Sequence, residues 1–437
     1  MRKSLTIAII FALVIVGAWL LSDNLYLSPY DARKFGISFT QLSGVLAIGL
    51  MAFSTLLAVR PVWLEPWLNG LDKMYRLHKW IGIIGMAISV AHWLTAQRPN
   101  GHRGSGAATT ETAASGAASF LSSLERPAHG VAQPALWILL ALVAVALVKL
   151  IPYHIFALSH RLVPVVFLVL IFHSVVLMKA SYWAAPIGWV MALVYLVGIA
   201  AALIATFRQI GAGRKVGGTV LAKTYFSDVR TLLVELKMDA GWKGHKPGQF
   251  AFVGSRRRWG AHPFTIASPW HAESQRISFI VKELGDTTQD LDSKLGVGTN
   301  LVVEGPYGHF NFEDSKPRQI WVSGGIGITP FVARMQQLSL RPENKKIDLF
   351  HSEATHADEA HDRMRADAAK SGVTLHLMVT PVHDRLTGAK IRETCPDFLS
   401  SSVWFCGATT FAAALKLDLM RHGLRSENFH HELFEMR

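Results

Sequence analysis

Cysteine is nearly absent from this chain of 437 residues, since only Cys395 and Cys406 occur and both lie near its C-terminal end. Two thiols exclude a disulfide framework, and they cannot supply the four thiolates of an iron–sulfur cluster within one chain. Acidic residues are also in deficit: 31 Asp and Glu stand against 44 Lys and Arg, for a formal charge of +13. The basic residues do not cluster with aromatic ones, so we expect no nucleic-acid partner. No EF-hand loop occurs, which excludes calcium control through such a loop.

Long apolar runs are abundant instead, and half of all residues are hydrophobic. Six runs have about the length needed to cross the roughly 30 Å of hydrocarbon in a bilayer. They cover residues 4–22, 37–59, 79–96, 134–151, 158–178 and 183–206. The first run resembles a signal peptide but lacks a small-residue cleavage site, so we interpret it as an uncleaved span. The sequence therefore predicts an integral membrane protein in contact with lipid, followed by a soluble part.

Lys and Arg orient the predicted spans. They precede the first span, separate the second from the third and the fourth from the fifth, and follow the sixth. By the positive-inside rule these ends are cytoplasmic, which places the N-terminus and the region after residue 210 in the cytoplasm. Residues 97–133 then form an outer segment rich in Gly, Ala and Ser, which we expect to be a flexible loop with His102 and His129 solvated. We interpret the membrane as a bacterial inner membrane.

Two of the predicted spans carry two histidines each. His78 and His92 are separated by about 21 Å along a helix and return to nearly the same face. His160 and His173 lie thirteen residues apart in the fifth run. Ionisable groups at membrane depth mark functional sites by default, and two such helices can clamp two stacked haems between imidazoles. The orientation pairs His78 with His160 near the cytoplasm, and His92 with His173 near the outside.

The thirteen-residue spacing leaves one difficulty, because it falls about 0.4 turn short of a common face. Pro164 lies between the two rings, so we expect it to kink or rewind the helix, or the two haems to be rotated relative to each other. A single membrane histidine is more often a satisfied polar contact than a ligand, and His154 competes with His160. Four histidines at matching depths nevertheless favour ligation of haem iron.

The composition changes after residue 210. Gly211-Ala-Gly213 and Gly217-Gly218 indicate a linker, and the apolar runs that follow are short. Residues 231–237 and 276–282 alternate between apolar and polar side chains, with turns between them. This pattern predicts antiparallel strands in a small barrel.

A second type of pattern begins after residue 315. Residues 319–323 form a short apolar strand that leads into Gly324-Gly-Ile-Gly-Ile-Thr-Pro330 and then a helix over about 330–340. A strand, a glycine turn and a helix start together favour an anion, since the glycines allow close backbone approach and the helix dipole attracts phosphate. Further predicted strands at residues 346–350, 374–379 and 402–406 alternate with helices. We expect a doubly wound parallel sheet.

These features in this order resemble the membrane flavocytochromes that include NADPH oxidases and ferric reductases, over residues from about 35 to the end. His262-Pro-Phe-Thr-Ile-Ala-Ser268 resembles the flavin-binding motif of that family, and the glycine turn resembles its nicotinamide-nucleotide motif. Cys406-Gly407 is similar to the family's Cys–Gly pair beside the nicotinamide. His431-Glu-Leu-Phe434 is similar to the terminal segment whose aromatic ring covers the flavin.

The resemblance implies three domains: a six-helix transmembrane dihaem bundle (residues 1–210), an antiparallel β-barrel FAD domain (211–315) and a doubly wound α/β NAD(P)H domain like that of ferredoxin–NADP reductase (316–437). The implied cofactors are FAD, two b-type haems, and NADPH or NADH. The residues implied for FAD are His262, Pro263, Phe264, Thr265, Lys282, Gly285, Thr288 and Phe434. Those implied for the nicotinamide nucleotide are Gly324, Gly325, Gly327, Thr329, Pro330, Cys406 and Gly407. Phe434 and Cys406 would lie at the reacting rings, although a C-terminal core anchor and a small buried apolar residue are the plain alternatives.

The nucleotide preference stays open. Family members that prefer NADPH often place Arg soon after the second strand of the nucleotide domain, where this sequence has Ala354. Glu353 would repel a phosphate and accept a hydrogen bond from a ribose hydroxyl, whereas Arg385 could compensate.

The implied activity is electron transfer from cytosolic NAD(P)H through FAD and the two haems to an external acceptor. We expect dioxygen as that acceptor, giving superoxide. A ferric chelate is the alternative within the same class. In another class, the chain would supply electrons to a periplasmic partner enzyme docked on residues 97–133. A haem sensor would leave residues 211–437 unexplained.

Overall fold

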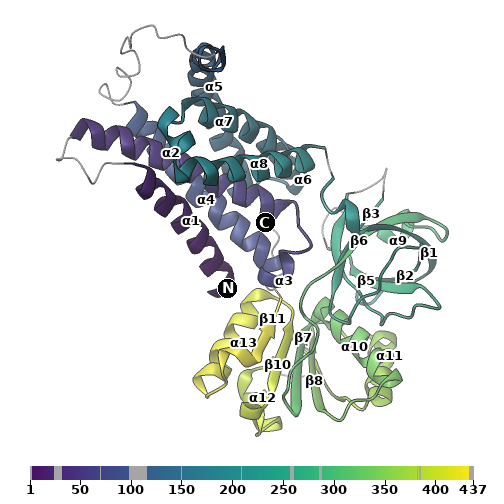
Figure 1. The fold of residues 1–437 in the computed structure, drawn as a ribbon. Helices are drawn as coiled ribbons and strands as arrows, with labels where there is room; N and C mark the ends of the chain where they lie inside the picture. Colours follow the sequence, from purple (N-terminus) through teal and green to yellow (C-terminus); the bar gives the residue numbers. More distant parts are fainter. Residues whose placement is uncertain are drawn as a thin grey trace. The chain divides into compact units, whose positions relative to one another are not determined.

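The computed structural model divides into two compact units, residues 1–210 and residues 211–434 (Figure 1). The residues that it describes are 2–23, 32–68, 70–97, 116–148, 150–207, 209–255, 260–284, 288–380, 382 and 385–432.

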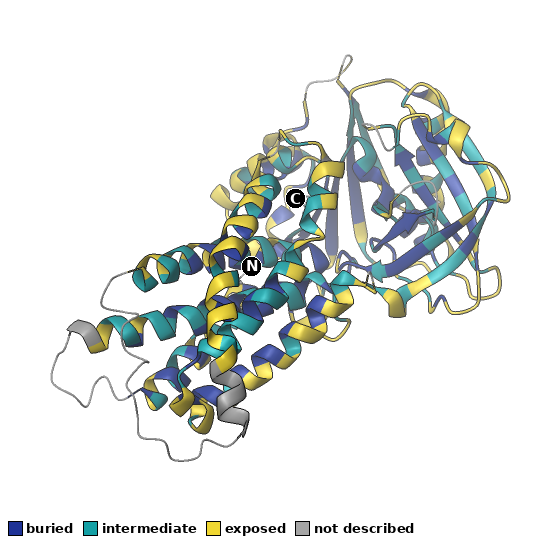
Figure 2. Cartoon of the chain, turned by 90° about the horizontal axis from the view of Figure 1, so that it is seen from above, coloured by how far each residue is buried: buried dark blue, intermediate teal, exposed yellow. Residues whose placement is uncertain are grey.

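The first unit is helical, and six of its segments in the described residues are long and apolar enough to cross a membrane. Its helices are α1 (Arg2–Ser22), α2 (Ala32–Ala58), α3 (Glu65–Leu68), α4 (Leu71–Ala96), α5 (Gly116–Leu147), α6 (Tyr153–His160), α7 (Val163–Leu177), the short η2 (Ala180–Ala184) and α8 (Pro186–Thr206). Many large apolar residues on these helices are exposed. Figure 2 shows exposed residues in yellow along the helices. Exposed apolar faces are what lipid requires of a spanning helix. The predicted set of six spans is confirmed.

Several spans begin earlier than the sequence predicts, and the difference is largest for α4 and α5. Helix α4 begins at Leu71 rather than near residue 79, because Lys73 and Arg76 lower the hydropathy of its first turns without breaking the helix. Helix α5 runs from Gly116 to Leu147 with two prolines inside it. Residues 116–133 are therefore helix, and the flexible loop predicted there is wrong for this part. His129 accordingly lies on α5; His102 lies outside the described residues.

The fifth span is interrupted. Helix α6 ends at His160, Arg161 and Leu162 form a turn, and α7 begins at Val163. Pro164 occupies the first turn of α7, where its missing N–H leaves no hydrogen bond unmade. The predicted rewinding beside Pro164 is confirmed.

Polar side chains tie the end of α1 to the segment after α7. The buried carboxylate of Asp23 accepts hydrogen bonds from the Tyr182 hydroxyl, from Ser38 and, at 2.9 Å, from Lys179 Nζ. Trp19 Nε1 donates to the Tyr182 hydroxyl at 3.0 Å. Because each charge is paired, this cluster can lie in an otherwise apolar bundle.

The second unit begins with an antiparallel sheet. Its strands are β1 (Lys215–Phe226), β2 (Thr231–Met238), β3 (Phe250–Gly254), β4 (His262–Thr265), β5 (Arg276–Lys282) and β6 (Asn300–Tyr307), with the short helix α9 (Leu291–Lys294) before β6. Their order is β4-β3-β6-β1-β2-β5, and a bridge from Ile266 to Phe279 joins the two ends into the predicted barrel. Gly217 and Gly218 lie within β1, so the linker predicted there is wrong. A Cβ on Gly217 would lie 2.1 Å from Asp239 Oδ2, and one on Gly218 would lie 3.1 Å from Met238 Sδ, so side chains on the neighbouring segment crowd both glycines.

A parallel sheet follows, as predicted. Its strands are β7 (Arg318–Gly324), β8 (Lys346–Glu353), β9 (Thr374–Val379), β10 (Ser402–Cys406) and β11 (Phe429–His431), in the order β11-β10-β7-β8-β9. The helices α10 (Thr329–Leu340) and α11 (Asp358–Ser371) pack with one apolar core, and α12 (Gly388–Thr394) and α13 (Thr409–Arg421) pack with another. Helices thus cover both faces of the sheet, which is the doubly wound arrangement.

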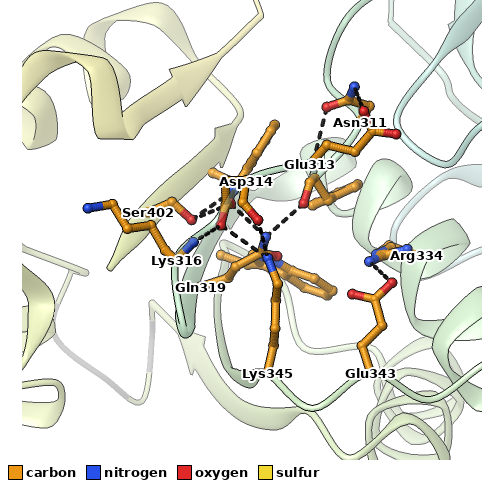
Figure 3. Close-up of polar contacts among 12 residues, drawn as sticks. Asn311, Glu313, Asp314, Lys316, Gln319, Arg334, Glu343, Lys345 and Ser402 are labelled. Atoms are coloured by element: carbon orange, nitrogen blue, oxygen red, sulfur yellow. Dashed lines mark hydrogen bonds and ion pairs between the residues drawn. The ribbon is translucent and has the colours of Figure 1, made fainter. Parts of the chain in front are cut away.

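The segment between β6 and β7 is anchored in the parallel sheet. Phe310 and Phe312 pack into the core that contains Trp404. Asp314 is the polar centre of this anchor (Figure 3): its carboxylate accepts hydrogen bonds from Ser402 Oγ at 2.7 Å and Trp404 Nε1 at 3.1 Å. It also accepts from Gln319 Nε2, Lys345 Nζ and the Lys316 backbone amide. This connection therefore belongs structurally to the parallel sheet.

Candidate functional site

The four histidines predicted as ligands lie in two facing pairs. The ring centroids of His78 on α4 and His160 on α6 are 6.1 Å apart, with planes at 82°. Those of His92 on α4 and His173 on α7 are 6.4 Å apart, at 80°. An imidazole nitrogen binds a metal at about 2 Å, so a metal between two imidazoles separates their centroids by about 6 Å. Both pairs have the separation that one shared iron atom needs.

The second nitrogen of three of these rings is already engaged. Nδ1 of His78 lies 2.8 Å from the carbonyl oxygen of Ser54, and Nδ1 of His92 lies 2.9 Å from that of Thr40. Nδ1 of His173 lies 2.9 Å from the carbonyl oxygen of Ala128. A carbonyl only accepts, so each Nδ1 must carry the proton. The lone pair of each ring is then on Nε2, which is the tautomer that a metal-binding histidine requires.

Helix α2 orients both histidines of α4. Thr40 and Ser54 are fourteen residues apart, as are His78 and His92. The two antiparallel helices therefore make the same contact, from a histidine Nδ1 to a backbone carbonyl, at both places along their length. Close packing accompanies the contact at His92, because a Cβ on Gly44 would lie 3.1 Å from its Cε1 atom. The residues present fit two bis-histidine haems.

His160 and the competing histidines differ from these three. Nδ1 of His160 is buried and has no hydrogen-bond partner among the described residues. His154 is exposed on α6. His129 is exposed on α5, although its ring centroid lies 6.4 Å from that of His173.

The residues of the flavin-like motif form the edge strand β4. His262, Phe264 and Thr265 are half-buried there, paired with β3. The ring of Phe264 meets Phe279 of β5 with centroids 6.5 Å apart, beside the bridge that closes the barrel. Half-buried side chains on a barrel edge leave one face of this strand open to a planar ligand. Burial lowers the pKa of His262, so its imidazole is neutral at pH 7.

The end of β5 carries the other residues predicted for FAD. Lys282 is the last residue of β5. The Thr288 hydroxyl accepts from the Leu284 amide at 2.7 Å and donates to the Leu284 carbonyl at 2.9 Å. The Thr288 hydroxyl thus bonds to both backbone groups of Leu284. Gly285 lies outside the described residues.

The glycine turn and Cys406-Gly407 are in direct backbone contact. The turn consists of η4 (Gly325–Ile328), followed by α10 from Thr329, with Pro330 in its first turn. A Cβ on Gly327 would lie 2.2 Å from the Cys406 carbonyl oxygen, so only glycine allows this approach. The Cys406 thiol is buried in the core, and burial raises its pKa, which argues against a nucleophilic role. The two motifs predicted for the nicotinamide nucleotide therefore meet at one edge of the sheet.

A cleft of about 570 Å³ lies between the barrel and the parallel sheet. Lys282 and Gly325 line it, together with Glu353 at the end of β8. Lys282 Nζ lies 3.6 Å from Glu353 Oε1, so one ion pair joins the barrel to the sheet across the cleft. A cleft of this size at the carboxyl ends of parallel strands is the usual position for a nucleotide.

The C-terminal strand β11 is held against β10 by stacking of His430 on Trp404, with centroids 4.1 Å apart. Glu432 then accepts a hydrogen bond from the His309 amide at 3.2 Å. Phe434, predicted to cover the flavin, lies outside the described residues.

Two family models match the chain in the order of these sites. The model "Ferric reductase like transmembrane component" matches residues 43–171, which hold His78, His92 and His160 and end two residues before His173. The model "FAD-binding domain" matches residues 218–311, which hold the barrel. This order, a ferric-reductase-like membrane component followed by an FAD-binding domain, is similar to that of the NADPH oxidase and ferric reductase family. The ferric-reductase-like component coincides with the candidate membrane spans, and the FAD-binding domain coincides with the antiparallel strands.

Curated relatives of this ferric-reductase-like chain match only parts of it. Ferric reduction oxidase 4 of Arabidopsis thaliana is 36% identical over 99 residues, which are 22% of this chain and 14% of the relative. The glycine betaine monooxygenase reductase subunit of Chromohalobacter salexigens is 27% identical over 206 residues, or 43% of this chain and 56% of the relative. The chain therefore spans little more than half the length of these relatives at most.

Solved structures with a similar trace include two flavoproteins. The cytochrome P450 reductase GcoB of Amycolatopsis is 20% identical over 51% of this chain and 70% of its own, with a TM-score of 0.45. The flavohemoglobin of Malassezia yamatoensis is 16% identical over 93% of this chain and 100% of its own, with a TM-score of 0.48.

The backbone contacts that orient the histidines of this chain were not predicted from its sequence. Ala128 contacts His173 through its backbone carbonyl. Every residue carries this group, so the contact cannot be predicted from the type of residue at position 128. Thr40 and Ser54 also act through their backbone carbonyls, and the Ser54 hydroxyl adds a side-chain contact, 2.9 Å from Nδ1 of His78.

Proposed function

We propose that this chain takes electrons from NAD(P)H on the cytoplasmic side of a bacterial inner membrane and delivers them to an acceptor outside. The observation that carries the proposal is the pair of histidine sites at 6.1 and 6.4 Å in the same chain as a barrel and a nucleotide cleft. Bound FAD would link the two-electron donor to the one-electron haems.

The chain's own residues would hold each group. His78 with His160, and His92 with His173, would ligate two b-type haems without covalent attachment. The edge strand β4 would carry the flavin ring, with Lys282 near its pyrophosphate. The glycine turn and Cys406-Gly407 would hold the nicotinamide nucleotide.

The acceptor that we favour is dioxygen, giving superoxide. Two imidazoles on each iron leave no open coordination position, so any acceptor would be reduced at the haem edge rather than at the metal. A ferric chelate is the second candidate, and the similarity to a ferric reduction oxidase of Arabidopsis thaliana supports it. A third candidate is a periplasmic partner enzyme, and the similarity to a reductase subunit supports that role as electron supplier.

An optical experiment on the purified protein in detergent tests the proposal. FAD and then NADH or NADPH are added without oxygen while the haem bands are recorded. Air is then admitted, and superoxide is measured with and without superoxide dismutase. Fast haem reduction and a matching dismutase-sensitive signal on reoxidation support an oxidase. Fast haem reduction followed by slow reoxidation in air would indicate that the acceptor is a ferric chelate or a protein rather than dioxygen. Absence of haem reduction with either nucleotide would refute the proposal.

A further inference from the structure

We infer that Glu353 makes this protein select NADH over NADPH. The inference rests on the proposed function, because it concerns the nucleotide in the cleft described above. It goes beyond that function by naming the donor and the residue that selects it.

Glu353 lies beside the glycine turn. It is the last residue of β8, and the pairing of β8 with β7 sets Ser352 opposite Gly324, where the turn begins. A Cβ on Gly325 would lie 4.0 Å from Glu353 Oε1. In dinucleotide sites of this topology, the phosphates lie over the glycine turn and the adenosine ribose lies at the end of the next strand. The Glu353 carboxylate is therefore where the ribose hydroxyls would be.

The carboxylate is held at this position by two basic side chains. Oε1 lies 3.6 Å from Lys282 Nζ, and Oε2 lies 3.5 Å from Nε2 of the buried His351. His351 is itself fixed, since its Nδ1 lies 2.8 Å from Ser323 Oγ on β7. The Glu353 side chain is only 11% exposed, so it cannot turn out of the cleft into solvent without losing these contacts.

The carboxylate is also charged. Burial alone would raise the pKa of Glu353, but the contacts with His351 and Lys282 outweigh it and hold the pKa below the usual 4.5. A charged carboxylate accepts hydrogen bonds from the 2′-hydroxyl of NADH. It would lie against the 2′-phosphate of NADPH, and two like charges in a partly buried cleft repel strongly.

The nearby cations do not offset this repulsion. Lys282 is engaged with Glu353 itself. Arg363 lines the cleft, but its guanidinium lies 4.9 Å from the ring centroid of Phe226 and pairs with Glu359 at 2.9 Å. Arg385, which could have compensated, is not among the residues that line the cleft.

Calorimetric titration of the full-length, FAD-loaded protein in detergent with NAD⁺ and with NADP⁺ tests the inference without relying on turnover. We expect NAD⁺ to bind at least about tenfold more tightly. In Glu353→Gln, which keeps the shape and removes the charge, we expect that ratio to fall by about tenfold or more. Glu235→Gln is the matched control, because Glu235 lines the same cleft but pairs with Arg276. It should leave the ratio unchanged.

The outcomes separate the inference from the proposed function. If the wild-type protein binds NADP⁺ as tightly as NAD⁺, or if Glu353→Gln leaves the ratio unchanged, Glu353 does not select NADH, while the proposed function stands. If neither nucleotide binds and neither reduces the haems, the proposed function itself fails. The wild-type comparison decides even if the variant does not fold.

Discussion

Nδ1 of His173 on α7 lies 2.9 Å from the carbonyl oxygen of Ala128 on α5, 45 residues earlier in the chain. Ala128 precedes the apolar run that identifies the fourth span in the sequence. The helix must therefore extend beyond that run for the outer histidine to be oriented. The first turns of α5, which are too polar to be recognised as part of a span, therefore supply the carbonyl that orients His173.

Replacing single histidines should remove one haem at a time. In His78→Ala or His160→Ala, and separately in His92→Ala or His173→Ala, we expect haem content to fall from two per chain to one, because each variant removes one of the two imidazoles that would hold one proposed haem. Pyridine haemochromogen assays measure the content. The outer-pair variants should keep NAD(P)H-to-FAD electron transfer but lose reduction of external acceptors.

The control for this series is His154→Ala, since His154 is exposed on α6 and faces no second imidazole in the described residues. It should retain both haems. Unchanged haem content in both outer-pair variants would refute the ligand assignment.

Gly44→Ala should perturb the outer haem selectively. The new Cβ would lie 3.1 Å from His92 Cε1, so the ring must shift by a few tenths of an ångström. We expect a destabilisation of about 1–3 kcal/mol and an altered low-spin spectrum of one haem, recorded by electron paramagnetic resonance. Gly36→Ala on the same helix meets nothing within 4 Å and serves as the control. Identical spectra for both variants would show that His92 does not ligate iron.

Gly327→Ala should disrupt the nucleotide site. Its Cβ would lie 2.2 Å from the Cys406 carbonyl oxygen, so the turn and β10 must separate. We expect nucleotide affinity to fall by at least about tenfold and stability by about 1–3 kcal/mol, measured by titration and thermal unfolding. Gly213→Ala meets nothing within 4 Å, lies outside the glycine turn and should behave like the wild type. Equal nucleotide affinity in the two variants would contradict a site at this turn.

Asp314→Asn should lower the free energy of unfolding by an amount that depends on pH. Burial alone would raise the pKa of Asp314, but hydrogen bonds from Ser402, Lys316, Lys345 and Trp404 outweigh it and lower the pKa below 3.8. A pKa lowered by folding adds stability above the unfolded value and loses it as pH falls through the folded value. We expect the variant to be about 1.5–3 kcal/mol less stable at pH 7.

Thermal unfolding from pH 7 down to about pH 3.5 measures this difference, which should shrink below about pH 4. Asp362→Asn is the control, because Asp362 is exposed and pairs only with Arg365 on the same helix in the described residues. A difference that stays constant with pH would show that the charge of Asp314 is not what anchors the segment.

Periodicity and motif order predicted the six spans, the barrel and the parallel sheet because these depend on where apolar side chains recur. The strand, glycine turn and helix at residues 318–340 were predicted within a residue or two. The early start of α5 could not be predicted, because hydropathy detects lipid contact, and residues 116–133 contain too many small and polar side chains. The ion pair of Lys282 with Glu353 was also missed, since it joins residues 71 positions apart on strands of different sheets.

His160 is held less firmly than the other three histidines. It ends the short helix α6, a two-residue turn separates it from α7, and its Nδ1 has no partner in the described residues. His92 and His173 are each fixed by a backbone carbonyl. The two pairs therefore differ. In the His78–His160 pair, one imidazole has no hydrogen bond at Nδ1 in the described residues, whereas both imidazoles of the His92–His173 pair have one. On the electron path proposed above, a small movement of α6 would slow entry of electrons at the His78–His160 site without altering the His92–His173 site.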